Sequence, residues 1–437
     1  MSNQHEVKVA IIGGGPAGSA AAAALARAGT EALVIEQEQF PRFHVGESLL
    51  PNCNTYLKKI GVWEKVRDSG YVIKRGGQFM LPDKSVNVLN DFAHGIVKKM
   101  DMTFQVERAK FDQTLFEHAQ ACGAQAWQQS KVVELKEVAD GWELKVLREG
   151  VQTTVKAEWL IDASGRKCVV GRQLKLKRES LPIPGRLAIF NHFRGIPRDA
   201  GDRGGDTLVV RLENAWVWLI PLAEGVTSVG VVLQSGDEDM KSLAVEEVFW
   251  QKIAQSSVLS ELLANADVIG PYRTDSDYSY AYECYGDRRA LLAGDASSFI
   301  DPVFSSGVCI ALKSGILAAE KIAAALAGKQ SEADIYAQYT EVLKQDMKEM
   351  RILIDMFYEP RGVELLMAPR PLFKIPQAVN SILAGVFKPG WRVRWRLWIF
   401  WQIYARHKKV GLVPKIDWMH VSRSPALAAK KSAAETV

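Results

Sequence analysis

A run of elements at the start of the chain constrains the fold more than any other feature of the sequence. Residues 7–12 (VKVAII) are apolar and β-branched, which is typical of a parallel strand buried on both faces. A glycine turn follows, and then an alanine-rich segment from Pro16 to Arg27 that we expect to be a helix. A second apolar strand is expected from Ala32 to Ile35, and Glu36 ends it. The order strand, turn, helix, strand and acid predicts an α/β fold.

The glycines of this turn fit the pattern G-x-G-x-x-G of a dinucleotide-binding loop. Gly13 permits a tight turn, Gly15 lets the backbone approach a pyrophosphate, and Gly18 lets helix and strand pack closely. Ala17 belongs to the same loop. Glu36 stands eighteen residues after Gly18, where a carboxylate accepts hydrogen bonds from a ribose hydroxyl. The spacing predicts a Rossmann-like domain that binds a dinucleotide, and an ordinary glycine turn is the alternative.

Two later segments indicate which dinucleotide is bound. A strand at 155–161 leads into the sequence DASGR, and a buried strand at 289–293 leads into the pair GD. A long helix is expected from about residue 306 to 326. With the N-terminal glycines, these segments resemble the FAD-binding fold of the aromatic hydroxylase class. The resemblance implies FAD as the cofactor, with Asp162 and Asp295 among its contacts. Only one G-x-G-x-x-G is present, so no separate NAD(P)H domain is expected.

Four further motifs resemble those of the flavin-dependent halogenases. Two of them match that family's patterns WxWxIP and F-x-x-P-x-x-S-x-G at every fixed position. A tryptophan pair at period two is also common in the core of a sheet, and the second motif also fits a loop that enters a helix. Both motifs together on an FAD-binding frame indicate a halogenase. The four are FPRFHVGESLLP (40–51), QVERAKFDQTL (105–115), WVWLIP (216–221) and FIDPVFSSG (299–307).

The resemblance implies an enzyme of the monooxygenase superfamily that uses FADH2, O2 and chloride or bromide to make hypohalous acid. A lysine then delivers the halogen to an electron-rich aromatic ring, and Lys74 in VIKRGGQF stands at the matching position. A lysine suits this role because its ammonium donates hydrogen bonds and because burial lowers the pKa of an amine. Lys74 also fits a solvated strand end, and the pair Lys98 and Lys99 offers a second basic position.

The resemblance also implies the other parts of the site. The halide is expected at Ser305, Ser306 and Gly307, because a nest of backbone N–H groups suits a small anion. The residues expected to line the passage for the oxidant are Trp216, Trp218, Pro302 and Phe304. The remaining flavin contacts are expected to be Arg42, Glu47, Ser48, Arg108 and Gly307. For the two arginines, a surface salt bridge is the alternative.

Phe304 departs from the pattern of the tryptophan halogenases, which carry a catalytic glutamate at this position. A substrate that needs a nearby carboxylate for indole chemistry is therefore disfavoured. A phenol or a pyrrole activates its own ring, so one of these is the expected class of substrate.

The composition excludes several classes of protein. No stretch reaches about 18 consecutive apolar residues, the length of a membrane-spanning helix. No secretory leader precedes the first strand, so a cytoplasmic protein is expected. The seven histidines show no metal-ligand spacing, and no metal is expected. The cysteines are odd in number and lie far apart in the sequence, which argues against a disulfide framework and a zinc site. They are Cys53, Cys122, Cys168, Cys284 and Cys309.

An inserted sheet and a helical C-terminal region are expected in the rest of the chain. Short strand-like runs in 72–100 and 181–282 predict an antiparallel sheet, inserted into an FAD-binding domain that spans 1–330. Residues 201–206 (GDRGGD) are expected to be a mobile loop. Residues 331–437 are expected to be mainly helical.

The C-terminal region is basic and rich in tryptophan. Residues 361–437 hold 14 Lys or Arg against 3 Asp or Glu. A helix over 391–409 places Trp391, Trp395 and Trp398 on one face. Three interpretations stay open: a helix packed on the body of the protein, a peripheral membrane contact through 388–409, and a dock for an acidic carrier protein that bears the substrate.

Several partners and rival functions follow from these features. A halogenase of this kind implies a separate NAD(P)H-dependent flavin reductase, an aromatic substrate that an acyl or peptidyl carrier protein can bear, and a role in antibiotic or pigment biosynthesis. Nucleic acid is not expected, because no base-reading motif accompanies the positive charge. The first rival is a flavin-dependent monooxygenase or a reductase of the geranylgeranyl-reductase type. The second rival is a non-catalytic, membrane-associated flavin-binding protein.

Overall fold

The computed structural model describes residues 4–180, 185–234, 243–277, 279–369 and 372–421. The chain forms two compact units, and each unit is assembled from three separate stretches of sequence. The first unit contains Met1–Ser69, Glu107–Leu181 and Ser279–Glu349, and the second contains Gly70–Val106, Pro182–Tyr278 and Met350–Val437. The boundary expected near residue 330 falls inside the first unit, because α9 (Glu332–Tyr358) begins there and ends in the second.

A largely parallel sheet forms the centre of the first unit. Its strand order is β18-β19-β10-β1-β2-β7, and β1 pairs in parallel with both β10 and β2. The hairpin β8–β9 adds to β10 in antiparallel orientation. The strands are β1 (Gln4–Ile12), β2 (Ala32–Ile35), β7 (Gln125–Trp127), β8 (Ser130–Val138), β9 (Gly141–Arg148), β10 (Val151–Asp162), β18 (Gly286–Asp287) and β19 (Ala290–Leu292). The predicted βαβ arrangement and the strand at 155–161 are confirmed.

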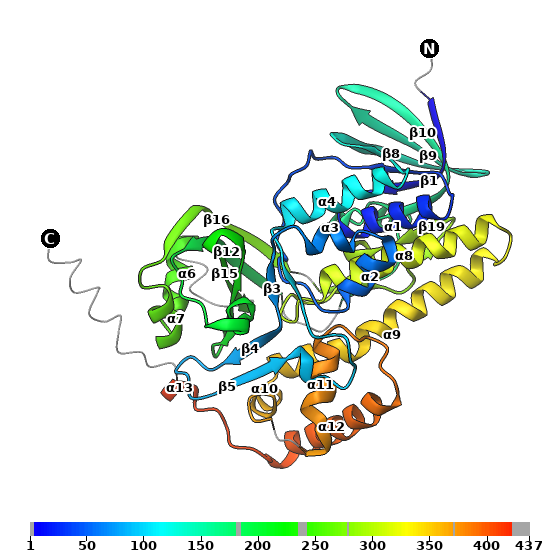
Figure 1. Cartoon of the computed structure of the whole chain (residues 1–437). Coiled ribbons are helices and arrows are strands. Elements are labelled where there is room, and N and C mark those ends of the chain that lie inside the picture. The colour runs from blue at the N-terminus through cyan, green and yellow to red at the C-terminus, as the bar shows by residue number, and fades with distance from the viewer. Residues whose placement is uncertain (1–3, 181–184, 235–242, 278, 370–371, 422–437) are drawn as a thin grey trace. The chain divides into compact units, whose positions relative to one another are not determined.

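Helices cover this sheet, and α1 (Pro16–Arg27) has the bounds predicted from its sequence. Its small alanine side chains let α8 (Gly307–Leu326) pack closely against it (Figure 1). A small antiparallel sheet, β11 (Arg178–Ser180), β17 (Tyr280–Tyr282) and β20 (Ser298–Phe299), lies beside η6 (Gly294–Ala296). The other helices are α2 (Cys53–Ile60), α3 (Trp63–Arg67), α4 (Arg108–Ala121), η2 (Gly165–Lys167) and α5 (Val169–Gln173).

A seven-stranded sheet forms the centre of the second unit, in the order β16-β12-β15-β14-β13-β4-β5. It is antiparallel except between β13 and β4, so the expected antiparallel sheet is a mixed one. Its strands are β4 (Gly76–Met80), β5 (Asn87–Asp91), β12 (Arg186–Arg194), β13 (Thr207–Arg211), β14 (Ala215–Pro221), β15 (Thr227–Gln234) and β16 (Asp267–Asp277). A separate ribbon pairs β3 (Val72–Lys74) with β6 (Thr103–Gln105).

One face of the seven-stranded sheet carries the apolar core of the second unit. Alternate residues of β14 and β15, such as Val217 and Val231, pack against Phe249. This phenylalanine lies on α6 (Val245–Ile253), which is followed by α7 (Ser257–Leu262). Because side chains alternate between the two faces of a strand, Trp216 and Trp218 lie on the opposite face, where they are also buried.

Residues 201–206 do not form the mobile loop that the glycines suggested. Gly201–Gly205 is a 3₁₀ helix, η3, packed against β3. The Gln105 side chain fixes it by donating a hydrogen bond of 3.0 Å to the Gly205 carbonyl. A buried side chain that is distant in sequence thus supplies the order that composition did not indicate.

Helices of the second unit follow the sheet in sequence. They are α10 (Pro360–Leu366), η7 (Leu372–Lys374), α11 (Ile375–Leu383), α12 (Trp391–Val410) and α13 (Trp418–Val421), and α12 contacts both α10 and α11 (Figure 1). The short turns η1 (Phe92–His94) and η4 (Ala223–Gly225) complete the unit. Among the helices of the described ranges, none is both long and apolar enough to cross a membrane.

Candidate active site

The glycine turn after β1 has the geometry that its sequence predicts. Gly13 adopts φ +104°, and an added Cβ there would lie 2.9 Å from the Ala163 carbonyl carbon and closer still to its oxygen. A Cβ on Gly18 would lie 3.1 Å from the Gly13 carbonyl carbon and closer still to its oxygen. Gly15 differs, because a Cβ there would meet nothing nearer than Arg42 Nη2 at 3.5 Å. The fold itself requires glycine at 13 and 18, whereas Gly15 leaves its backbone open to approach.

Glu36 is buried at the edge of this turn. Its Oε2 accepts a hydrogen bond of 2.7 Å from Gly14 N, and its Oε1 accepts one of 2.9 Å from Glu38 N. Arg42 Nη2 lies 3.8 Å from Glu36 Oε2. The structure therefore brings together the predicted residues Gly15, Glu36 and Arg42 at the carboxyl ends of β1 and β2, the edge where parallel sheets bind ligands.

Asp112 on α4 is a site residue that the sequence motifs did not single out. Arg108 donates two parallel hydrogen bonds to its carboxylate, Nε to Oδ1 at 2.8 Å and Nη2 to Oδ2 at 2.9 Å. Arg42 Nη1 lies 3.5 Å from the same carboxylate. The i, i+4 spacing of Arg108 and Asp112 on a helix was the signal that could have found this pair.

Arg108 also connects α4 to the GES segment. Its Nη1 donates to the Val45 carbonyl at 2.9 Å. Burial lowers the pKa of Arg108, but the charges of Asp112, Asp295 and Glu47 outweigh burial and raise it. Glu47 and Ser48 are themselves buried. Arg108 is buried and the Arg42 side chain is only 13% exposed, so the alternative of a surface salt bridge is wrong for both arginines.

Asp162 and Asp295 have different surroundings. The Asp162 carboxylate is fully buried at the end of β10, where it accepts hydrogen bonds from Val170 N at 2.7 Å and Ser164 N at 3.1 Å. Burial raises the pKa of Asp162. This carboxylate holds the loop that leads to α5, and its contact with FAD stays a prediction. Asp295 lies half-buried in η6, which is fixed because Tyr280 Oη donates to its carbonyl at 2.7 Å.

The predicted halide residues open α8. Ser305 adopts φ +56°, Ser306 is buried, and Gly307 is exposed, with nothing within 4 Å of an added Cβ. A 20-residue helix thus begins at a backbone that an anion can approach, with the positive end of the helix dipole directed there. Phe304 is buried and Pro302 is exposed, and the passage they are expected to line stays a prediction.

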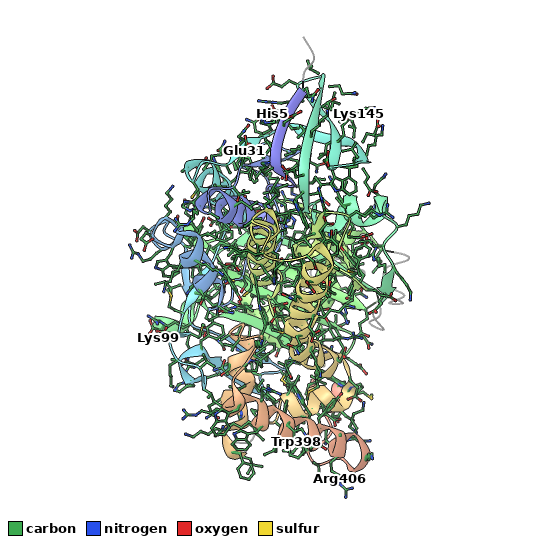
Figure 2. All side chains as sticks on the ribbon, turned by 90° about the vertical axis from the view of Figure 1, so that its right-hand side faces the viewer. His5, Glu31, Lys99, Lys145, Trp398 and Arg406 are labelled. Atoms are coloured by element: carbon green, nitrogen blue, oxygen red, sulfur yellow. The ribbon has the colours of Figure 1, made fainter. Side chains whose placement is uncertain are left out.

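Lys74 belongs to the second unit and is only 4% exposed. It ends β3 opposite Thr103 of β6, so its side chain shares one face of the ribbon with Thr103 and Gln105. Its Nζ lies 5.4 Å from the centre of the Phe92 ring. Lys98 and Lys99 are both exposed, and Figure 2 shows Lys99 pointing outward. The alternative that Lys74 is a solvated strand end is therefore wrong.

Two buried acceptors lie in the surroundings of Lys74 without a hydrogen-bond partner among the described residues. One is Oδ1 of Asp206, whose carboxylate also accepts hydrogen bonds from the backbone N–H groups of Gly76 and Arg75. Burial raises the pKa of Asp206, and the positive charge of Lys74 opposes that effect. The other is Oε1 of Gln105. Buried polar atoms of this kind can accept a hydrogen bond from a bound molecule.

Trp216 and Trp218 lie side by side on β14, with their ring centres 5.8 Å apart. Trp216 Nε1 donates to Tyr358 Oη at 2.7 Å, and Trp218 Nε1 donates to Ser228 Oγ at 3.2 Å. Trp218 stands opposite Gly230 of β15, where only a glycine leaves room for the indole. Both indoles are buried and hydrogen-bonded, and the tunnel that they are expected to line stays a prediction.

Comparison with known proteins places the chain in a family. The FAD binding domain family matches residues 6–349. The 1H-pyrrole-2-carbonyl-peptidyl-carrier-protein chlorinase of Pseudomonas fluorescens is 34% identical over 380 residues, which cover 82% of this chain and 84% of that protein. The chain belongs to the flavin-dependent halogenase family. It is an enzyme of the FAD-dependent oxidoreductase superfamily, and its cofactor is FAD.

Solved structures agree with the expected fold of this halogenase. A flavoprotein/dehydrogenase from Cytophaga hutchinsonii has a TM-score of 0.85 and 25% identity, and the match covers 93% of this chain and all of that one. The flavin-dependent brominase Bmp2 has a TM-score of 0.81 and 27% identity, covering 92% of this chain and 99% of that one. The predicted FAD-binding fold of the aromatic hydroxylase class is confirmed.

The residues of the first unit fit FAD. The open backbone at Gly15 suits a pyrophosphate, and the buried carboxylate of Glu36 suits a ribose hydroxyl. Arg42 and Arg108 add positive charge beside these groups. Within the described ranges, no group of three or more His, Cys, Asp and Glu side chains is arranged to hold a metal ion.

Proposed function

We propose that this halogenase adds chlorine or bromine to a pyrrole or phenol ring that is held as a thioester on a carrier protein, with Lys74 delivering the halogen. The burial of Lys74 carries the proposal. Burying a charged lysine costs free energy, and proteins keep such costly buried groups mainly at functional sites. The chlorinase relative supports the carrier-bound pyrrole, since its name specifies that substrate. Phe304, which takes the place of a glutamate, supports a ring that activates itself.

Reduced FAD, when bound, would supply electrons to O2, and the halide would be oxidised to hypohalous acid. A separate NAD(P)H-dependent reductase provides the reduced flavin, since the chain carries only one dinucleotide-binding motif. Ser305, Ser306 and Gly307 hold the halide through backbone N–H groups at the start of α8. Residues of the glycine turn and the Arg42 and Arg108 network hold the cofactor.

Lys74 performs the transfer. Its ammonium donates a hydrogen bond to the oxygen of hypohalous acid and gives up a proton as the halogen–oxygen bond breaks and the carbon–halogen bond forms. The oxygen leaves as water, and the neutral amine then takes the proton that the ring carbon loses. Hypohalous acid and the ring C–H thus become aryl halide and water. Asp206 and Gln105 give the amine polar neighbours that hold it in position.

Mass spectrometry of the products tests this function. The holoenzyme is supplied with a flavin reductase, NADH, chloride or bromide, and pyrrole-2-carbonyl or hydroxybenzoyl thioesters of a carrier protein. A halogen isotope pattern is expected with the wild type and with the Lys98→Ala/Lys99→Ala control. Lys74→Ala is expected to lower the rate at least about 100-fold while retaining FAD, because a general acid–base group contributes this much. Full halogenation by Lys74→Ala would refute the role of this lysine.

The likeness to the flavoprotein/dehydrogenase makes a reductase or monooxygenase the second candidate. Such an enzyme would reduce a double bond or insert oxygen without using halide. The same mass spectra separate the two candidates, since a product that gains two hydrogens or one oxygen in the presence of halide would overturn halogenation.

A further inference from the structure

Helix α12 turns tryptophan and positive charge towards solvent. Trp391 is 72% exposed and Trp398 is 62% exposed, although such rings normally lie inside a protein. Arg394, Arg406 and Lys409 are exposed on the same side by helical spacing, and these five residues are called the α12 outer face. Figure 2 labels Trp398 and Arg406, both projecting from this helix. The helix contains six Arg or Lys and no Asp or Glu.

The opposite side of α12 holds the helix on the second unit. Val393, Leu397 and Phe400 are buried there. His407 is fully buried, with Nε2 3.3 Å from the Glu364 carboxylate and Nδ1 accepting a hydrogen bond of 2.7 Å from Leu412 N. The interpretation of the segment as a helix packed on the body is therefore correct for this side, and it leaves the outer face unexplained.

The composition of the outer face suits a protein partner better than a lipid surface. A membrane-surface helix inserts a continuous apolar face between lipids, but the apolar side of α12 is already buried. What remains outside is two tryptophans separated by arginines, which are the residue types that dominate protein–protein hot spots. The exposed ring of Phe373, 6.4 Å from Trp395, extends this surface. With no acid on the helix, the complementary partner is acidic.

A chain of contacts within the second unit connects α12 to Lys74. Helix α12 packs on α11, where Asn380 Nδ2 donates to the Asp91 carbonyl. Ser381 Oγ, also on α11, accepts a hydrogen bond of 2.9 Å from Ile96 N. The segment held in this way carries Phe92, the ring that faces the Lys74 ammonium. A partner that binds α12 is therefore connected, through α11 and the segment with Phe92, to the surroundings of the proposed catalytic lysine.

We infer that the α12 outer face docks an acidic carrier protein, which presents its aromatic acyl thioester to the site of Lys74. This inference rests on the proposed function for the identity of the acyl group, and it goes beyond that function by assigning the surface that selects the carrier. The tryptophans supply the apolar contact and the cations supply orientation and a fast encounter.

Binding is measured separately from catalysis, so that the two proposals fail independently. The probe is a fluorescently labelled holo-peptidyl carrier protein loaded with pyrrole-2-carbonyl thioester, titrated with the FAD-loaded full chain. Arg394→Glu/Arg406→Glu is expected to raise Kd at least about tenfold, and Trp398→Ala about tenfold or more, as for central hot-spot residues. Wild-type binding is expected to weaken as salt is raised.

A matched control carries the same charge change elsewhere. Lys131 and Lys136 are exposed on β8 in the first unit, and Lys131→Glu/Lys136→Glu should leave Kd within about twofold of the wild type. The pyrrole-2-carbonyl thioester of pantetheine, without a carrier protein, reports on catalysis alone. The Arg394→Glu/Arg406→Glu enzyme should process it at the wild-type rate, which also shows that the variant folds.

Each outcome decides one proposal. If the α12 variants bind the loaded carrier as tightly as the wild type, or if the wild type does not bind it, docking at this face is refuted, even when halogenation proceeds. If binding depends on α12 but no halogen enters the product, docking stands and the proposed function fails. Cosedimentation of the wild type with phosphatidylglycerol vesicles, lost in Trp391→Ala/Trp398→Ala while carrier binding is unchanged, would assign the face to a membrane and overturn the inference.

Discussion

Substituting Gly230 by alanine tests how tightly the tryptophan motif is packed. An added Cβ would lie 2.5 Å from Cε2 of Trp218 and closer still to Cζ2 and Cη2. The indole has no easy way to move. Its Nε1 donates to Ser228 Oγ at 3.2 Å, and the rings of Trp216 and Phe190 stand 5.8 and 5.9 Å away, centre to centre. Gly230→Ala must therefore displace a buried ring or its strand.

The magnitude follows from two opposing effects. Overpacking of a core costs about 1–3 kcal/mol. Alanine gains about 0.5–1 kcal/mol over glycine because the unfolded chain loses less conformational freedom on folding. The net loss in the free energy of unfolding of the second unit is about 1–2 kcal/mol. In Gly77→Ala on β4 the nearest atom to the new Cβ is Thr207 O at 3.5 Å, so this control should be neutral or slightly stabilising.

Urea unfolding followed by tryptophan fluorescence measures the effect as a shift of the transition midpoint at constant slope. The double variant Trp218→Leu/Gly230→Ala completes a cycle, and the smaller leucine should recover at least about 1 kcal/mol of the loss. If Gly230→Ala unfolds at the wild-type midpoint, or destabilises equally with leucine at 218, the steric reasoning is wrong. If Gly230→Ala displaces the Trp218 indole, the halogenation rate of this variant should fall as well as its stability.

Three further predictions concern single side chains. Arg108→Lys should lower stability by about 1–3 kcal/mol and release FAD on gel filtration, because lysine cannot form both hydrogen bonds to Asp112; unchanged FAD retention would contradict this. Burial lowers the pKa of His118, whose Nε2 donates to the Ile60 carbonyl at 2.8 Å, so the folded protein keeps it neutral while the unfolded chain takes up a proton near pH 6.5. Stability should therefore fall below about pH 6.5, and less so in His118→Gln, by urea midpoints at pH 7.5 and 5.5; equal losses would refute this. Asp206→Asn should lower kcat about tenfold with unchanged FAD binding if the carboxylate positions Lys74, and an unchanged kcat would exclude that role.

Local signals made the dinucleotide end of the chain predictable. Pro16 fixes the start of α1, the alanines give it a strong helical preference, and Gly13 and Gly18 occupy positions where a side chain would collide with backbone. Glu36 could be placed because a buried strand of four residues leads directly to it. These features depend on neighbours close in sequence, so pattern alone is sufficient to find them.

Structural features that depend on partners distant in sequence could not be predicted from sequence patterns. The parallel pairing of β13 with β4 joins strands more than a hundred residues apart, and no local pattern encodes it. The order of η3 comes from Gln105, whose hydrogen bond to the Gly205 carbonyl spans 100 residues of sequence. Asp112 is a different case, because its partner Arg108 stands only four residues before it and this local spacing was a signal that the motifs did not use. The burial of Lys74 became visible only when β3 was paired with β6.

The interleaving of the two units has a consequence for synthesis on the ribosome. The central sheet of the first unit needs β19 at 290–292, and its helix α1 packs against α8, which ends at residue 326. The second unit cannot finish before its last helices emerge. The first unit therefore cannot form from the N-terminal part of the chain alone, and a polypeptide stopped at residue 280 would expose the edge of β10 that pairs with β19 to aggregation.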